Sequence, residues 1–522
     1  MLRNLLSSHQ TGSNLVQPAT HFKTSNSVDR LGLLYPAIAF DRLALILSRA
    51  LLNISLSTLI PYSDSGGRGI LQEWSQQSVK CCLTKGENAV HKYHLRLFLF
   101  IIDTMKNLRM LLILCFPIFI LGLVTCDNSK NTGIISSWVQ AGPNGVTIAR
   151  VISHRDNCPE IRVNGVGVQM EVRHSPDNDF PVLVCEIIIP QGTVTASVEG
   201  RALKLPVENP KRLVVIADTG CRLETGDVPQ SCNDPQAWPF ERIAKTAASF
   251  NPDLVVHVGD YLYREDPCPP GDQGCEGSPF GDNYASWDAD FFSPANKLLR
   301  AAPWAFTRGN HEECSRGGKG WFTFLDPNPP FEDCQEFTPP YVIDIGLVNL
   351  LMLDSSAAED NSAPADMVEV YASQIATLEN ASGDNAWFVT HHPFWGIGED
   401  SGELLMINDT LQAASDNVLT GGINLVLSAH IHLFELLNFE GGRQSQFVIG
   451  MSGTELDPPV TKPLVGVEIG GATVAEGIVL NNQFGFALME LEGDVWHVSI
   501  RGVEGEEILA CEIDGDLATC FP

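Results

Sequence analysis

The chain has 522 residues, of which 44% are hydrophobic and 18% are charged, a composition typical of a globular protein with more than one domain. Its formal net charge is -30, and because residues 1–104 carry a net charge of +4, the remainder carries -34. So acidic a body argues against nucleic acid or an anionic membrane surface as a binding partner.

Residues 105–126 have the features of an export signal. Lys106 and Arg109 form a short basic region, and an apolar stretch follows and ends just before Cys126 in a sequence that resembles a lipoprotein processing box. The stretch is too short, and too interrupted by Pro117, for an ordinary transmembrane helix. We therefore expect a signal peptide or lipoprotein-like segment, export to the periplasm or cell envelope, and membrane attachment by a lipid on Cys126.

Residues 1–104 precede this signal, although a secretion signal must be amino-terminal to work. They contain scattered apolar runs but no clear framework of strands or helices. We expect them to be a spurious upstream extension, with the protein beginning at Met105. A genuine disordered or membrane-associated leader is the alternative.

Residues 127–208 are predicted to form a small all-β domain, because apolar residues alternate in short segments separated by turn sequences. Residues 209–522 then alternate strand-like runs with helical stretches at 238–249, 296–301 and 367–379, and end in strand-like runs at 484–491 and 496–501. This alternation predicts an α/β domain.

Ten cysteines follow Cys126, and neighbours along the chain fall into five local pairs. An even number in an exported protein predicts a framework of disulfides, although sequence alone does not fix which cysteines pair. Cysteine-ligated zinc is the alternative, but the chain has no Cys-x-x-Cys repeat.

Five short blocks within residues 217–432 carry oxygen and nitrogen side chains of the kind that bind Zn, Fe or Mn. They are Ala217-Asp218-Thr219-Gly220, Gly259-Asp260-Tyr261-Leu262-Tyr263, Gly309-Asn310-His311-Glu312, Thr390-His391-His392-Pro393 and Ala429-His430-Ile431-His432. Most of them follow a short apolar, β-branched run, so we expect each to leave the carboxyl end of a strand, where open α/β sheets hold their ligands. Each block alone would be an ordinary turn or strand end, and only the whole set predicts a metal site.

This set of blocks resembles the calcineurin-like metallophosphoesterases, and two details narrow the resemblance to the purple acid phosphatase branch. Most of that superfamily has a histidine at the position of Gly220. The purple acid phosphatases instead have a tyrosine three residues after the second aspartate, and Tyr263 stands at that distance from Asp260. The resemblance implies a four-layer sandwich of two mixed β-sheets flanked by helices, here preceded by the small β domain.

The resemblance also implies two metal ions, Fe(III) and a divalent Zn, Fe or Mn. The implied ligands are Asp218, Tyr263 and His432 for the first ion, Asn310, His391 and His430 for the second, and Asp260 as a bridge between them. His311 would protonate the leaving group. His392 and Arg308 are predicted to bind substrate, with Arg264 and Arg316 as alternatives. Ala429 replaces the usual glycine of the last block, so either its φ is negative or strain is tolerated.

The sequence therefore predicts an exported phosphatase that hydrolyses phosphate monoesters of small molecules by attack of a metal-bound hydroxide. A phosphodiesterase or nucleotidase on the same fold is one alternative, because the fold and the ligands do not select the ester. A non-catalytic envelope lipoprotein that only binds metal or phosphate is another.

Overall fold

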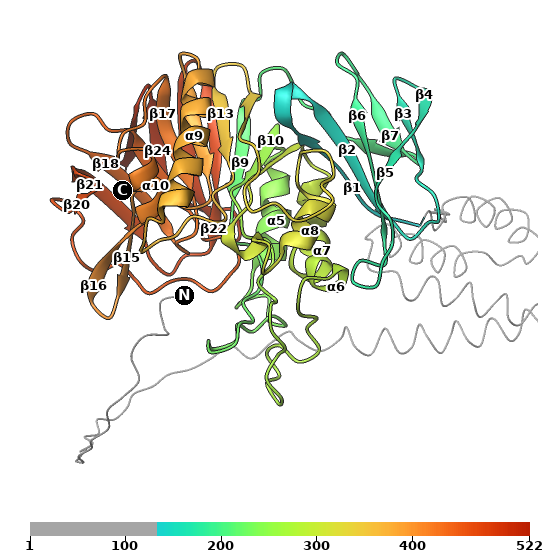
Figure 1. The fold of residues 1–522 in the computed structure, drawn as a ribbon, viewed down its shortest axis with the longest axis horizontal. Helices are drawn as coiled ribbons and strands as arrows, with labels where there is room; N and C mark the ends of the chain where they lie inside the picture. The colour runs from blue at the N-terminus through green and yellow to red at the C-terminus, as the bar shows by residue number, and fades with distance from the viewer. Residues whose placement is uncertain (1–132, 522) are drawn as a thin grey trace, which may run out of the picture. The chain divides into compact units, whose positions relative to one another are not determined.

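The computed structural model describes residues 133–521, which are built around two large β-sheets packed face to face (Figure 1). The predicted export segment and residues 1–104 lie outside the described residues. No helix within 133–521 has both the length and the apolar character needed to cross a bilayer.

The first sheet has eleven strands, and its centre is parallel. Its strands, in spatial order, are β25 (Leu517–Phe521), β24 (Glu507–Asp514), β23 (Val495–Gly502), β22 (Gly485–Glu492), β9 (Arg212–Ile216), β10 (Leu254–His257), β11 (Trp304–Phe306), β1 (Ile134–Ala141), β2 (Thr147–Ser153), β6 (Leu183–Ile189) and β5 (Glu171–His174). The two runs predicted to close the chain correspond to β22 and β23, and both are confirmed as antiparallel strands.

The second sheet has eight strands, of which β13, β14, β17 and β19 run parallel. In spatial order they are β12 (Tyr341–Asp344), β13 (Asn349–Leu353), β14 (Ala386–Thr390), β17 (Ile423–Ser428), β19 (Ser445–Ile449), β18 (Phe434–Phe439), β21 (Ala472–Leu480) and β20 (Glu468–Ile469). A separate two-stranded hairpin consists of β15 (Gly396–Asp400) and β16 (Glu403–Ile407).

Successive side chains of the central strands point to opposite faces of the sheets, and both faces pack against a hydrophobic core. In β9, Leu213 and Val215 point into the core between the two sheets, whereas Val214 and Ile216 point into the core under the helices. Both faces of these strands are buried, which explains why the sequence there is continuously apolar and not alternating.

Helices cover the outer face of each sheet, so the predicted four-layer sandwich is confirmed. The first sheet is covered by the segment containing α5 (Phe240–Ser249), α6 (Tyr284–Trp287), η2 (Asp288–Phe292), α7 (Ser293–Leu299) and α8 (Gly318–Phe324). The second sheet is covered by α9 (Ala365–Ala381) and α10 (Asp409–Ala414). The three predicted helices correspond to α5, α7 and α9.

The segment between residues 133 and 207 consists of strands and one short 3-10 turn, η1 (Pro143–Gly145). Four of its strands extend the first sheet, because β1 pairs in parallel with β11. The others form a small sheet of β4 (Val166–Gln169), β3 (Glu160–Val163), β7 (Ala196–Val198) and β8 (Arg201–Leu203). The fully buried Arg150 of β2 also donates hydrogen bonds to the carbonyls of Phe324 and Asp326. The domain boundary at residue 208 stays a prediction.

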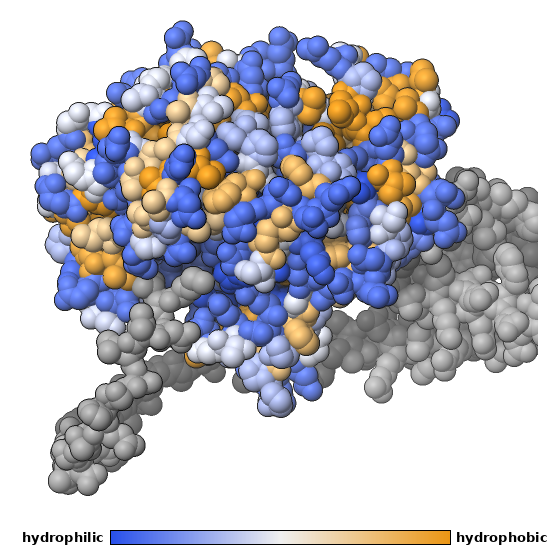
Figure 2. All heavy atoms as spheres, in the orientation of Figure 1, coloured by the Kyte–Doolittle hydropathy of each residue, from blue (hydrophilic) through white to orange (hydrophobic). Residues whose placement is uncertain are grey.

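Five disulfides join cysteines that are neighbours along the chain, which confirms the predicted framework. They are Cys158–Cys185, Cys221–Cys232, Cys268–Cys275, Cys314–Cys334 and Cys511–Cys520. Three of these crosslinks lie in the loops that follow β9, β10 and β11. The face of the molecule in Figure 2 is largely hydrophilic with smaller hydrophobic groups between, as expected for so acidic a chain.

Candidate metal centre

The predicted ligands lie in loops at the carboxyl ends of parallel strands of both sheets. Asp218 follows β9, Asp260 follows β10, His391 follows β14 and His430 follows β17. Carboxyl ends of parallel strands share one edge of a sheet, so these loops meet where the two sheets face each other.

Three of these residues have a left-handed backbone, with φ of 52° at Asp218, 58° at Asp260 and 73° at His430. This conformation is uncommon outside glycine and is concentrated at functional sites, where the surrounding structure offsets its cost. In the last block the left-handed residue is thus His430 and not Ala429. The replacement of the usual glycine by Ala429 therefore causes no backbone strain at that position.

The hydroxyl of Tyr263 is the centre of the first group of ligands. It lies 2.9 Å from Asp218 Oδ1, 2.9 Å from Asp260 Oδ2 and 3.0 Å from His432 Nε2. The other ring nitrogen of His432 lies 2.8 Å from the Glu455 carbonyl, which fixes the orientation of the ring. All four side chains are buried.

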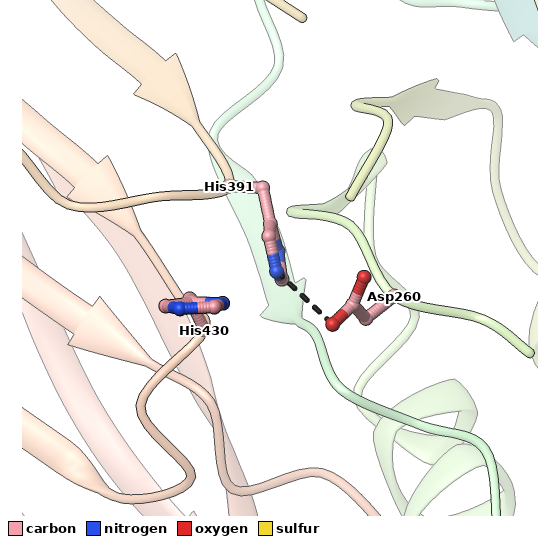
Figure 3. A group of neighbouring side chains, drawn as sticks. All are labelled: Asp260, His391 and His430. Carbon is pink, nitrogen blue, oxygen red and sulfur yellow. Dashed lines mark ion pairs between the residues drawn. The ribbon is translucent and has the colours of Figure 1, made fainter. Parts of the chain in front are cut away.

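The second group is centred on the side-chain oxygen of Asn310. Asn310 Oδ1 lies 3.1 Å from His391 Nε2 and 3.0 Å from His430 Nδ1. His391 Nε2 also lies 3.1 Å from Asp260 Oδ2, the ion pair drawn in Figure 3. The same oxygen of Asp260 therefore contacts the first group through Tyr263 and the second through His391, as a bridging carboxylate would.

Gly220 explains why a tyrosine is found in this site. A Cβ atom at residue 220 would lie 2.7 Å from the Tyr261 carbonyl oxygen and 2.8 Å from the Tyr263 nitrogen. Contacts this short exclude any side chain, so the loop that brings Tyr263 to the site occupies the space that a histidine at position 220 would need.

Gly259 permits a similarly close approach on the other side of Asp260. Its φ is +98°, and a Cβ there would lie 2.5 Å from Nδ1 of His391. That nitrogen lies 2.8 Å from the Val258 carbonyl oxygen, so Nε2 is the atom turned toward Asp260. The glycine thus lets the His391 ring pack directly against the loop that carries Asp260.

Burial and charge in this cluster favour a bound cation. Although burial opposes its ionisation, His391 and then His311 hold the pKa of Asp260 well below its usual range. Burial, followed by the charges of Asp218 and Asp260, raises the pKa of Tyr263 well above its usual range. Among residues 133–521, no lysine or arginine forms an ion pair with either aspartate. In that range, only histidines offset the charge of these two buried carboxylates, and this set of oxygen and nitrogen donors fits metal ions.

His311 stands beside the ligands without joining either group. Its Nε2 lies 3.9 Å from Asp260 Oδ2, whereas its Nδ1 lies 2.7 Å from Glu265 Oε1. Arg316 also contacts His311 and forms an ion pair with Glu265. Burial, followed by the charge of Arg316, holds the pKa of His311 well below its usual range.

The two predicted substrate-binding residues are not among those that line the adjacent cavity. His392 is buried behind the site, with its ring centroid 4.1 Å from that of His430 and no partner for its Nδ1. Arg308 is also buried, where it donates to the carbonyls of Glu312 and Gln335 and pairs with Asp354. The guanidinium of Arg308 thus makes its contacts inside the fold, and a role in binding substrate stays a prediction for both residues.

Other residues that line the cavity were missed or left as alternatives by the sequence. Arg316 was an alternative to Arg308, and Arg222 and Asp360 were not predicted at all. Arg222 lies two residues beyond Gly220, and proximity to a ligand block was its only sequence signal. Asp360 lies in a loop between β13 and α9 far from every block, so no local pattern indicates it.

Glu312 belongs to a predicted block but had no predicted role. Its carboxylate accepts hydrogen bonds from the backbone nitrogens of Asp260, Tyr261 and Leu262. Burial, followed by the charge of Asp260, raises the pKa of Glu312 to about 8. The side chain therefore fixes the loop that carries two of the predicted ligands.

Residues 211–434 match the model of the calcineurin-like phosphoesterase family. Similar solved structures include the purple acid phosphatase PPD1 from yellow lupin (Lupinus luteus) seeds, with 14% identity and a TM-score of 0.48 over 73% of this chain and 74% of that one. PhoD has 12% identity and a TM-score of 0.46, covering 75% and 91%. A dimetal phosphatase from Danio rerio has 10% identity and a TM-score of 0.35, covering 59% and 100%.

A search of curated proteins found no match. The match of residues 211–434 includes the block residues from Asp218 to His432, and so contains all the ligands that converge in the structure. Through these residues the chain is similar to the calcineurin-like phosphoesterase family.

Proposed function

We propose that this chain is a two-metal phosphatase of the purple acid phosphatase type, which hydrolyses phosphate monoesters of small molecules. The observation that carries the proposal is the convergence of one hydroxyl, that of Tyr263, with Asp218, Asp260 and His432. A tyrosine in this position, together with Gly220, distinguishes the purple acid phosphatases that the sequence resembles.

The first metal ion would be held by Asp218, Tyr263 and His432, the second by Asn310, His391 and His430, and both by Asp260. When bound, such a pair of ions activates water and stabilises the charge on a phosphoryl group. Fe(III) with a divalent Zn, Fe or Mn ion is the pair that we propose, because a phenolate favours a trivalent ion.

His311 would act as the general acid. Its Nδ1 contacts Glu265, and its Nε2 faces the ligand cluster. Because the pKa of His311 is low in the free protein, the negative charge of a bound phosphate would have to raise that pKa so that a protonated ring can donate to the departing oxygen. Arg222 and Arg316 line the same cavity and would attract the anionic phosphate, which the acidic body of the protein repels. We propose these two arginines for the phosphate-binding role that the sequence analysis gave to His392 and Arg308.

Turnover of matched esters tests the proposal. Purified protein should contain two metal ions per chain, hydrolyse an aryl phosphate monoester and act much more slowly on the corresponding diester. A preference for the diester or for nucleotides would favour the phosphodiesterase or nucleotidase alternative. Metal content without turnover of any ester would favour the non-catalytic lipoprotein.

We also propose that the protein is exported and anchored by a lipid on Cys126. The five disulfides support an oxidising compartment, because such bonds are rare in reducing cytosol. Mass spectrometry of the protein purified from membranes should find a lipidated Cys126 as its first residue. Recovery of peptides that precede Met105 would contradict the proposed processing.

A further inference from the structure

We propose that the β15–β16 hairpin recognises the organic part of the substrate, so that the preferred esters are phosphate monoesters of alcohols that carry an apolar group. This inference rests on the proposed function, because it specifies which ester the site accepts. The hairpin contributes Gly398, Leu405 and Ile407 to the lining of the cavity that also contains Asp260, Asn310 and His430.

The register of the hairpin turns one of its faces toward the cavity. Gly398 pairs with Leu405 and Gly396 pairs with Ile407, and cross-strand partners project to the same face of an antiparallel pair. The intervening Ile397 projects to the other face, where it is fully buried in the core beneath the second sheet. Two apolar side chains, each opposite a glycine, therefore form this part of the cavity wall.

Gly398 leaves open space beside Leu405. A Cβ atom at Gly398 would have no heavy atom within 4 Å, and its φ is not in the left-handed region. The absence of a side chain here is thus required neither by the backbone nor by a close neighbour. It gives the cavity room next to an apolar surface.

The rest of the lining is mostly polar. Arg222, Arg316 and His311 provide positive and hydrogen-bonding groups beside the predicted metal ligands, although both arginines also pair with acidic side chains. The carboxylates of Glu224, Asp360, Glu399 and Asp457 line the cavity too. A phosphate would be held beside the arginines, while Leu405, Ile407 and Pro458 provide apolar surface for the group attached to it. A phosphate ester with an alkyl or aryl substituent would bind more tightly, because contact removes water from the apolar surfaces of both the substituent and the cavity wall.

Besides the pairing of its two strands, the hairpin is anchored by hydrogen bonds to residues 461 and 462. The Glu399 carboxylate accepts hydrogen bonds from the backbone nitrogens of Thr461 and Lys462 and from the Thr461 hydroxyl. Lys462 also pairs with Glu403 on the neighbouring strand. A wall anchored in this way is formed before substrate arrives, which favours selectivity.

Two phosphonates that cannot be hydrolysed, ethylphosphonate and phenethylphosphonate, test the inference by calorimetric titration of the metal-loaded full chain. We expect phenethylphosphonate to bind at least about ten-fold more tightly, the scale of discrimination that added apolar groups give in a hydrophobic pocket. Its binding should also show a more negative heat-capacity change, the marker of apolar burial.

Three variants then locate the effect. Gly398→Leu should fill the open space, Leu405→Ala should remove apolar surface, and each should bring the affinity ratio of the two ligands toward one. Met406→Ala is the matched control, because Met406 is adjacent to Leu405 but is 43% exposed and does not line the cavity. It should preserve the wild-type ratio.

Equal binding of the two ligands by the wild type, or a ratio unchanged in both hairpin variants, would overturn the inference while the phosphatase proposal stands. If the protein binds neither phosphonate and hydrolyses neither ethyl nor phenethyl phosphate, the proposed function itself fails. A Gly398→Leu protein that does not fold leaves the decision to Leu405→Ala, which only removes atoms from a partly exposed position.

Discussion

The Nε2 atom of His430 lies 2.9 Å from the Oδ2 atom of Asp360. The opposite nitrogen of that ring, Nδ1, lies 3.0 Å from Asn310 Oδ1 in the second ligand group. A carboxylate that accepts the Nε2 proton fixes the tautomer in which Nδ1 carries the free lone pair. Asp360 is therefore a positioning residue for a predicted ligand.

We expect Asp360→Ala to weaken metal binding at the second site by roughly 10- to 100-fold, the usual cost of losing such a partner. Competition with a chelator, followed by metal analysis, would measure the change. The melting temperature of the metal-free protein should stay close to that of the wild type. Asp494→Asn, at an exposed turn far along the chain, is the control and should change neither quantity. Unaltered metal affinity in Asp360→Ala would contradict the positioning role.

Tyr263→Phe should remove the visible absorption of the iron-loaded protein. The substitution keeps the ring and deletes only the hydroxyl that contacts Asp218, Asp260 and His432. Because ferric phenolate absorbs visible light by charge transfer, the wild type should be coloured and the variant bleached. Absorption spectra at equal iron content provide the measurement. An active wild type that contains two metal ions but is colourless and free of iron would argue against Fe(III) at this site.

His311→Ala should reduce turnover by roughly 10²–10⁴-fold on esters with poor leaving groups. The loss should be smaller on activated aryl phosphates, whose leaving groups depart without protonation. Steady-state kinetics on both kinds of ester, with metal content measured in parallel, separate the effects. Equal losses on the two esters would instead indicate that His311 binds or orients the substrate.

Asp282 should make the stability of the fold depend on pH. Burial raises the pKa of this carboxyl from 3.8 to about 6, even though Trp287 and two backbone nitrogens donate hydrogen bonds to it. A raised pKa means that the folded state binds a proton more tightly than the unfolded state. The stabilisation is therefore complete below the ordinary pKa and is lost as pH rises through the folded one.

The free energy of unfolding of the wild type, relative to that of Asp282→Asn, should accordingly fall between pH 4 and pH 6. Urea denaturation of both proteins over this range measures the difference. The comparison is needed because other carboxyls titrate in the same range and cancel between the two proteins. A difference that stays constant with pH would show that Asp282 ionises as it does in the unfolded chain, and one that rises would show that folding lowers its pKa.

The sequence alone predicted the layers of the fold and which side chains would lie together as candidate metal ligands, because both depend on local patterns. Apolar runs followed by Asp218, Asp260, His391 and His430 indicate strands that end in ligand loops, and the structure brings these side chains together. A framework of disulfides was likewise predictable, and its bonds join local partners because the ends of a short loop meet at a small entropy cost.

Only the tertiary structure decided which other side chains surround the ligands. Arg308 adjoins Gly309 in sequence, yet the direction of its side chain sends it into the interior, whereas Arg222 and Asp360 reach the cavity. The hairpin wall depends on a strand register that the sequence does not encode locally. The candidate metal ligands can be recognised from residue types at neighbouring positions in the sequence. The side chains that surround those ligands depend on how loops distant in sequence pack against one another, and such packing is a property of the whole chain.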